Sequence, residues 1–161
     1  MKNPFGFAIW LSLLSFMGGC FSYAVVLSER PLGSESRSLS EAELRAALTA
    51  VANVAVEFRL TSSSTFEQYR EAWAQSHPPI TLLALYVREA DRETRESRVF
   101  VAAYLDGTNA FSVLVRAWDN VGETEFSRGL RERLRQALDA ALPTHPMQVE
   151  RVRDLPILFR P

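Results

Sequence analysis

The segment from Ile80 to Val87 is almost wholly apolar, and it constrains the fold more than any other stretch of the chain. In a β-strand, successive side chains point to opposite faces of the sheet, so a continuous apolar run presents apolar groups on both faces. The segment from Val99 to Leu105 has the same character. An antiparallel sheet commonly leaves one face to water, which gives an alternating pattern instead. We therefore expect a sheet that is covered on both faces.

Short connections link these two segments to each other and to a third apolar segment, Phe111 to Trp118. The turn from Asp106 to Asn109 has the composition of a hairpin, in which Gly107 is free to adopt a positive φ. Strands joined by short connections are antiparallel neighbours. Met147 to Val152 is expected to add a fourth strand, so the predicted sheet is antiparallel with three to four strands.

Three helices are predicted from apolar residues that recur at three-to-four spacing. Ser40 and Glu43 form a capping box at the start of the first helix, and Ser64 and Glu67 repeat the pattern before the second. The predicted helices run from residue 40 to between 58 and 61, from 65 to 75, and from 123 to 142. The order of elements indicates an α+β fold, an antiparallel sheet of three to four strands packed with three helices.

Two further arrangements would also cover an apolar sheet face. One is an apolar cleft between sheet and helix, suited to a lipid tail or to an apolar element of a partner. The residues expected to line such a cleft are Tyr86, Phe100, Tyr104 and Trp118. The other arrangement is a dimer interface. Division of the three helices between the two faces is the simpler interpretation.

The beginning of the chain is typical of an export signal. Lys2 and the amino terminus supply positive charge, an apolar run follows from Phe5 to Phe16, and small residues precede Cys20, the only cysteine. Met17-Gly18-Gly19-Cys20 resembles the lipobox of bacterial lipoproteins. The resemblance implies a diacylglycerol on the Cys20 thiol, cleavage before Cys20 and acylation of the new amine. In Gram-negative members an Asp after the cysteine favours the inner membrane, so Phe21 implies the outer membrane.

This interpretation divides the chain into three parts. Residues 1–19 are the signal peptide, residues 20–38 are the lipid-anchor and tether segment, and residues 39–161 are a single α+β domain. Within the second part, Ser28 to Ser38 contains proline, glycine and four serines, which is the composition of a flexible spacer. The lone cysteine excludes an intrachain disulfide, so the core must supply the stability of the domain.

Two alternatives for the leader remain open. No charge occurs between Lys2 and Glu29, so Phe5 to Leu27 is also long enough to span a bilayer as an uncleaved helix. The third possibility is cleavage and secretion. All three place the domain outside the cytoplasm, in the first case held by lipid to a membrane that faces the periplasm.

Few residues suggest chemistry. The formal net charge of −1 gives no basic excess for nucleic-acid binding. His77 and His145 are expected on the surface, no metal-binding or nucleophile motif is present, and no cofactor is predicted. The carboxylates that might form an acid–base pair are Asp106, Asp119, Glu89 and Asp91.

The sequence therefore favours a membrane-anchored envelope lipoprotein that binds a protein partner or an apolar ligand and performs no catalysis. One alternative is a small envelope hydrolase that uses carboxylates. The other is a single-pass subunit of an inner-membrane complex, in which the leader stays as a bilayer helix.

Overall fold

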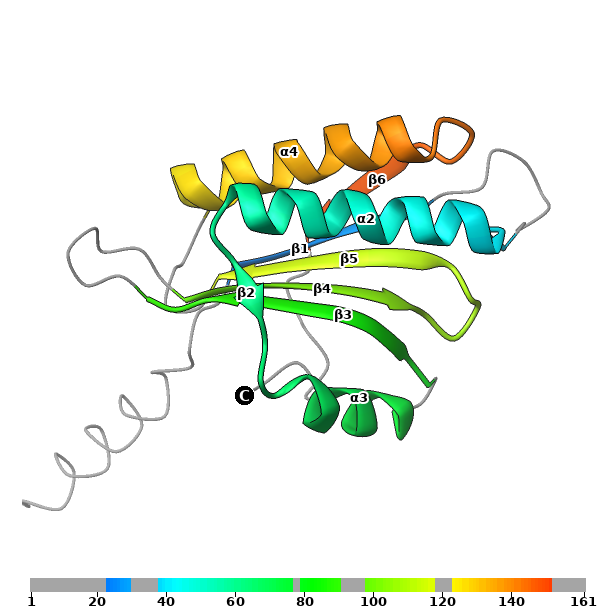
Figure 1. The fold of residues 1–161 in the computed structure, drawn as a ribbon, viewed down its shortest axis with the longest axis horizontal. Coiled ribbons are helices and arrows are strands. Elements are labelled where there is room, and N and C mark those ends of the chain that lie inside the picture. Colours follow the sequence, from blue (N-terminus) through cyan, green and yellow to red (C-terminus); the bar gives the residue numbers. More distant parts are fainter. Residues whose placement is uncertain (1–22, 30–37, 77–78, 91–97, 118–122, 152–161) are drawn as a thin grey trace, which may run out of the picture.

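The computed structural model of the 161-residue chain describes residues 23–29, 38–76, 79–90, 98–117 and 123–151 (Figure 1). These residues form a six-stranded antiparallel sheet with the strand order β2-β3-β4-β5-β1-β6, and three helices. The strands are β1 Tyr23–Glu29, β2 Thr61–Ser62, β3 Thr81–Arg88, β4 Val99–Leu105, β5 Phe111–Ala117 and β6 Met147–Arg151. The helices are α2 Glu41–Glu57, α3 Phe66–Ala74 and α4 Glu125–Ala141. The predicted α+β class is confirmed, with two or three more strands than expected.

The additional inner strand is β1. It lies between β5 and β6, with Tyr23 opposite Ala117 and Val25 opposite Arg151. The sheet therefore includes residues from Tyr23 on, ahead of the predicted domain start at residue 39, and Ser28 and Glu29 belong to this strand and not to a tether. Residues 30–37, the rest of the predicted tether, lie outside the described residues and follow β1 along the chain.

The cap of α2 forms as predicted. The backbone N–H of Ser40 donates to the Glu43 carboxylate at 2.8 Å, and the Glu43 backbone N–H donates to the Ser40 hydroxyl at 3.3 Å. The second predicted cap does not form, because Thr65 and not Ser64 is the N-cap of α3 and its side chain makes no cap hydrogen bond. A cap that the sequence did not indicate begins α4, where Thr124 and Ser127 satisfy each other's backbone N–H groups.

The end of α2 is held by backbone hydrogen bonds that require a left-handed residue. The Leu60 N–H donates to the Ala55 carbonyl at 2.8 Å, and the Arg59 N–H donates to the Val56 carbonyl at 3.0 Å. This pair of bonds is a Schellman motif, which normally has glycine at the left-handed position. Arg59 occupies it here with φ 59°. The helix therefore ends in a conformation that is unfavourable for a residue with a Cβ atom.

Helices cover both faces of the sheet, as the apolar strands predict. Helices α2 and α4 pack on one face, where Leu130, Leu134 and Leu138 of α4 are fully buried. Helix α3 packs on the other face, where Trp73 is fully buried and meets Tyr104 edge-on with 5.6 Å between ring centroids. Figure 1 shows the two long helices above the sheet and α3 below it.

A β-bulge changes the faces expected for β3. Strict alternation predicts Leu82, Ala84 and Tyr86 on one face, but the register shifts between Leu82 and Ala84. Leu82 consequently packs with Trp73 on the α3 face, and Tyr86 packs on the face of α2 and α4. In the hairpin that follows β4, Asn109 has a positive φ of 62°.

Candidate functional site

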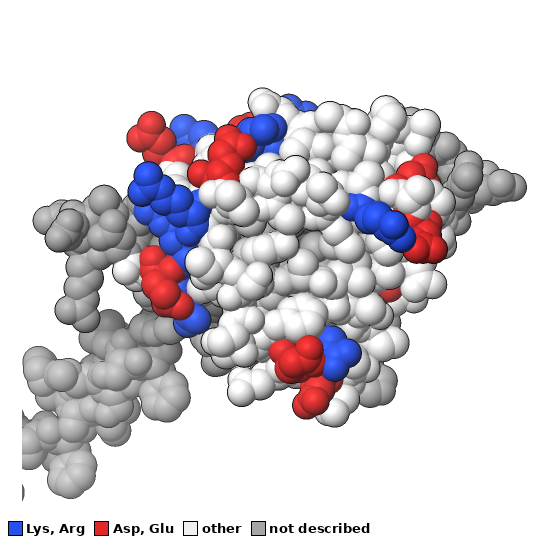
Figure 2. All heavy atoms as spheres, viewed as in Figure 1, with Lys and Arg blue, Asp and Glu red and all other residues white. Residues whose placement is uncertain are grey.

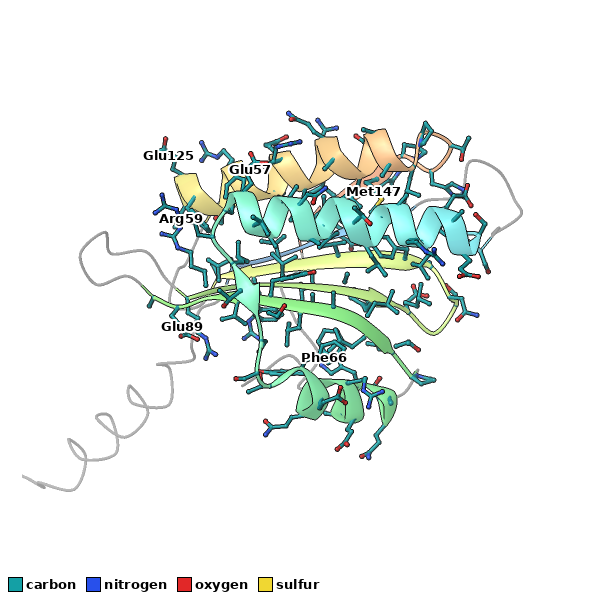
Figure 3. All side chains as sticks on the ribbon, viewed as in Figure 1. Glu57, Arg59, Phe66, Glu89, Glu125 and Met147 are labelled. Atoms are coloured by element: carbon teal, nitrogen blue, oxygen red, sulfur yellow. The ribbon has the colours of Figure 1, made fainter. Side chains whose placement is uncertain are left out.

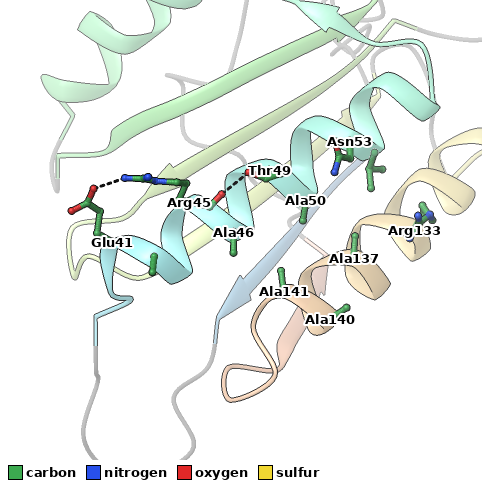
Figure 4. Close-up of a pocket in the computed structure, with 12 residues that line it drawn as sticks. Glu41, Arg45, Ala46, Thr49, Ala50, Asn53, Arg133, Ala137, Ala140 and Ala141 are labelled. Carbon is green, nitrogen blue, oxygen red and sulfur yellow. Dashed lines mark hydrogen bonds and ion pairs between the residues drawn. The ribbon is translucent and has the colours of Figure 1, made fainter.

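The described surface carries an open groove between α2 and α4, on the side of these helices that faces away from the sheet (Figure 4). Its volume is about 970 Å³. Its central lining residues are Ala46, Ala50 and Val54 of α2 together with Ala137, Ala140 and Ala141 of α4. Because an alanine side chain ends at Cβ, these positions leave the seam between the two helices unfilled. The groove is therefore a direct result of alanine spacing on both helices.

Charged side chains stand at the two ends of this groove. At one end, the Arg45 guanidinium lies 2.7 Å from the Glu41 carboxylate, one turn earlier in α2. At the other end, Arg133 of α4 reaches Glu57 of α2, with 2.9 Å between Nε and Oε2. Both pairs are exposed, and such pairs contribute about 0–1 kcal/mol to stability. The two ion pairs place hydrogen-bonding groups at both ends of an apolar floor.

The rim of the groove adds neutral polar groups. The Thr49 hydroxyl donates to the Arg45 carbonyl at 2.8 Å, and the Asn53 amide is exposed. Among the residues that line the groove there is no histidine, cysteine or serine. The arrangement is suited to binding an apolar surface with a polar edge.

The residues predicted to line an apolar cleft are not brought together. Tyr86 packs on the face of α2 and α4, whereas Phe100 and Tyr104 pack on the α3 face, and Trp118 lies outside the described residues. The sheet itself separates the first residue from the other two. The apolar groups of both faces fill the core, and the predicted cleft is wrong as a single site.

Both of these tyrosines have a raised pKa. Burial raises the pKa of Tyr104 to about 12; its hydrogen bond with Ser112 partly offsets this, and the nearby charge of Asp106 raises the pKa further. Burial also raises the pKa of Tyr86. Both effects come from packing in the core and keep these phenols neutral and protonated.

The candidate carboxylates have structural roles where they are described. Asp106 accepts hydrogen bonds from the Thr108 backbone N–H at 2.8 Å and the Ala110 backbone N–H at 3.0 Å, which closes the β4–β5 hairpin. Glu89 is exposed and lies 3.3 Å from the Arg98 guanidinium. Asp91, Asp119 and His77 lie outside the described residues.

The prediction that His145 lies on the surface is wrong. Its exposed fraction is 7%, and its Nε2 lies 3.7 Å from a carboxylate oxygen of Glu43. Its backbone N–H donates to the Leu142 carbonyl, directly after α4. His145 therefore joins the end of α4 to the beginning of α2. Within the described residues, no three His, Cys, Asp or Glu side chains are grouped in a way that could hold a metal ion.

Two features of the structure, the buried Arg116 and the groove, carried no sequence signal. Arg116 is only 4% exposed although it lies on the α3 face of β5, opposite Phe100 of β4. The groove also went unnoticed, because its alanines are indistinguishable in sequence from the apolar residues that pack against the sheet. No helix in the described part of the chain is long and apolar enough to cross a bilayer. Cys20 precedes the described residues.

Comparison with known proteins gives no relative. No protein family, no curated protein and no solved structure matches the chain. What the protein does must therefore be argued from its own residues.

Proposed function

We propose that this protein is an envelope lipoprotein, anchored through Cys20, whose domain binds a helix of a partner protein and performs no catalysis. The observation that carries the proposal is the groove between α2 and α4. Both faces of the sheet are packed, so a partner must bind an outer surface, and this groove combines an apolar floor with charged ends. The carboxylates of the hydrolase alternative that are described, Asp106 and Glu89, already serve a turn and an ion pair.

The proposed occupant follows from the shape and chemistry of the groove. Its floor runs along two neighbouring helices and is made of alanines, which allow another backbone to approach closely. An amphipathic helix places apolar side chains into such a groove and polar side chains at its rim. The pairs Glu41–Arg45 and Glu57–Arg133 provide charge at both ends for the polar side chains of that helix.

The position of β1 favours a lipid anchor on Cys20 over a membrane-spanning helix. Lipoproteins usually continue with polar residues after the lipidated cysteine, but here Tyr23 to Leu27 are apolar. These residues form β1, which lies between two other strands, and this explains why they are apolar. A membrane-spanning helix from Phe5 to Leu27 would have to give up the residues that form β1.

Two experiments in the native cell test the proposal. Radiolabelled palmitate should enter the wild-type protein and not the variant Cys20→Ser; equal labelling of the two would reject acylation of this thiol. A photo-crosslinking residue at Ala46 in the groove should capture a partner protein. The same residue at Glu71, exposed on α3, is the matched control.

The partner must also be displaced from the groove specifically. The variant Ala140→Trp, on the α4 side, should suppress the crosslink from position 46 because the indole ring fills the groove. Equal crosslinking from positions 46 and 71, or a crosslink that persists in Ala140→Trp, would contradict binding in the groove.

A further inference from the structure

The chain between Cys20 and the first strand is very short. Three peptide links join the Cα atoms of Cys20 and Tyr23, so these atoms can be at most about 11 Å apart in any conformation. The serine-rich segment that was expected to act as a spacer follows β1, and it therefore does not separate the anchor from the domain. A lipid on Cys20 would hold the sheet directly at the bilayer.

The backbone register shows which part of the domain lies nearest to Cys20. Tyr23 is opposite Ala117, Ala117 is opposite Val99, and Val99 is opposite Arg88. These four residues form a row across one end of the sheet. We refer to this row, with the adjoining end of α2 and start of α4, as the anchor end.

Aromatic contacts place the two helices at the anchor end. The Arg88 guanidinium lies 4.4 Å from the centroid of the Phe126 ring in the first turn of α4. Phe58, at the end of α2, meets the same ring edge-on at 5.6 Å. Figure 3 shows Arg59, Glu89 and Glu125 at this end of the molecule, and Figure 2 shows both acidic and basic side chains gathered there.

We propose that the anchor end rests on the lipid headgroups of an anionic bilayer, with α2, α4 and the groove rising away from the membrane surface. This inference rests on the proposed function, because it requires the lipid on Cys20. Strands β1, β4 and β5 and helices α2 and α4 run along one common direction (Figure 1), so fixing one end fixes the orientation of the whole domain.

Among the described residues of the anchor end, Arg59 is an exposed cation suited to contact with lipid phosphate. It is exposed, and none of the described residues forms an ion pair with it. Two other arginines do form ion pairs, Arg98 with Glu89 and Arg133 with Glu57. Its left-handed conformation is one that glycine would adopt at lower cost. Its charged side chain is available for a contact outside the domain, worth about 1 kcal/mol at an anionic surface.

Two labelling positions at opposite ends of α4 test this orientation. Glu125 begins the helix at the anchor end, and Thr144 follows its other end; both are exposed. A helix of this length spans about 25 Å, whereas the headgroup layer is only about 5–8 Å deep. Cys20 is the only natural cysteine and its thiol is blocked by acylation, so Glu125→Cys and Thr144→Cys each supply a single reactive thiol.

The full-length acylated variants, labelled with a fluorophore, are inserted into vesicles of phosphatidylethanolamine and phosphatidylglycerol that contain a nitroxide-headgroup lipid. The expected result is severalfold stronger quenching at position 125 than at position 144. A flexible Gly-Ser insert of about ten residues between Ser22 and Tyr23 should abolish that difference, since it adds a mean reach of about 17 Å.

Equal quenching at the two positions in protein that carries the lipid mass would overturn the orientation and leave the proposed anchor intact. Quenching that stays unequal after the insert would equally overturn the assignment of the orientation to the short chain. A mature protein without lipid on Cys20, determined by mass spectrometry, would instead reject the proposed function itself.

Discussion

The indole ring of Trp73 stands at 86° to the phenol ring of Tyr104, and this contact holds α3 on the sheet. Trp73 is the only buried residue of α3, and its ring also meets Tyr69 edge-on at 6.4 Å. Phe66 and Tyr69 of this nine-residue helix are partly buried against the same cluster. Trp73 is therefore the main buried contact between α3 and the sheet.

Replacing Trp73 with alanine should lower the free energy of unfolding by about 3–5 kcal/mol, because it removes a buried aromatic group and leaves a cavity. Trp73→Phe keeps a ring in contact with Tyr104 and should cost clearly less. Urea denaturation followed by circular dichroism measures both values. Similar stability of Trp73→Ala and the wild-type protein would show that α3 does not contribute to the fold.

The burial of Tyr104 predicts a loss of stability at high pH. Its folded pKa is raised to about 12, above an unfolded value of about 10, so the stabilisation is complete below pH 10 and is lost as pH rises toward 12. The loss should be about 2–3 kcal/mol. Thermal unfolding between pH 9 and 12 measures it, with phenolate absorbance as the report of ionisation. Tyr104→Phe cannot ionise, and the pH dependence should be smaller in that variant.

Arg59 should trade stability for membrane contact. Arg59→Gly removes the cost of the left-handed conformation and should raise the free energy of unfolding by up to about 1 kcal/mol. Arg59→Ala removes the same charge but keeps a Cβ atom, so it should not gain this stability. Both variants should bind phosphatidylglycerol vesicles less strongly than the wild type, as measured by flotation. A gain of stability in Arg59→Ala equal to that in Arg59→Gly would contradict the conformational argument.

The ion pair between Arg133 and Glu57 should contribute little to the fold. Both side chains are almost half exposed, so water and salt screen their attraction. A double-mutant cycle with Arg133→Ala and Glu57→Ala should give a coupling energy below about 1 kcal/mol in denaturation experiments. The same cycle on partner binding should show larger effects, because the pair closes one end of the groove. A coupling energy of several kcal/mol in the isolated protein would give the pair a structural role instead.

Local patterns were sufficient for most elements of the fold. Val99–Leu105 is a strand with the predicted bounds. Phe100 and Tyr104 point to one face of the sheet, and Val99 and Val101 point to the other, as alternation requires. The capping box at Ser40 marked the start of α2 correctly. These features depend on residues that are close in sequence, so they can be predicted without knowledge of the tertiary structure.

The errors concern features that depend on distant residues. The apolar residues of β1 directly follow the leader without an intervening charge, and their partners lie at residues 112–117 and 147–151, so hydrophobicity alone could not separate strand from leader. The bulge in β3 is a matter of register with β4 and reverses the face of Leu82. The groove requires two sets of alanines, on α2 and α4, to be brought side by side by packing on the sheet.

The position of β1 between β5 and β6 also determines when the sheet can be completed. Among the described strands, the first along the chain hydrogen-bonds only to the last two, so it has no strand edge to join until residues 112–117 have been synthesised. Pairing between segments so remote along a polypeptide is slow, because a large loop must close first. If the chain is exported as proposed above, this topology would keep the native sheet from forming before passage through a translocation channel, which a polypeptide must traverse unfolded.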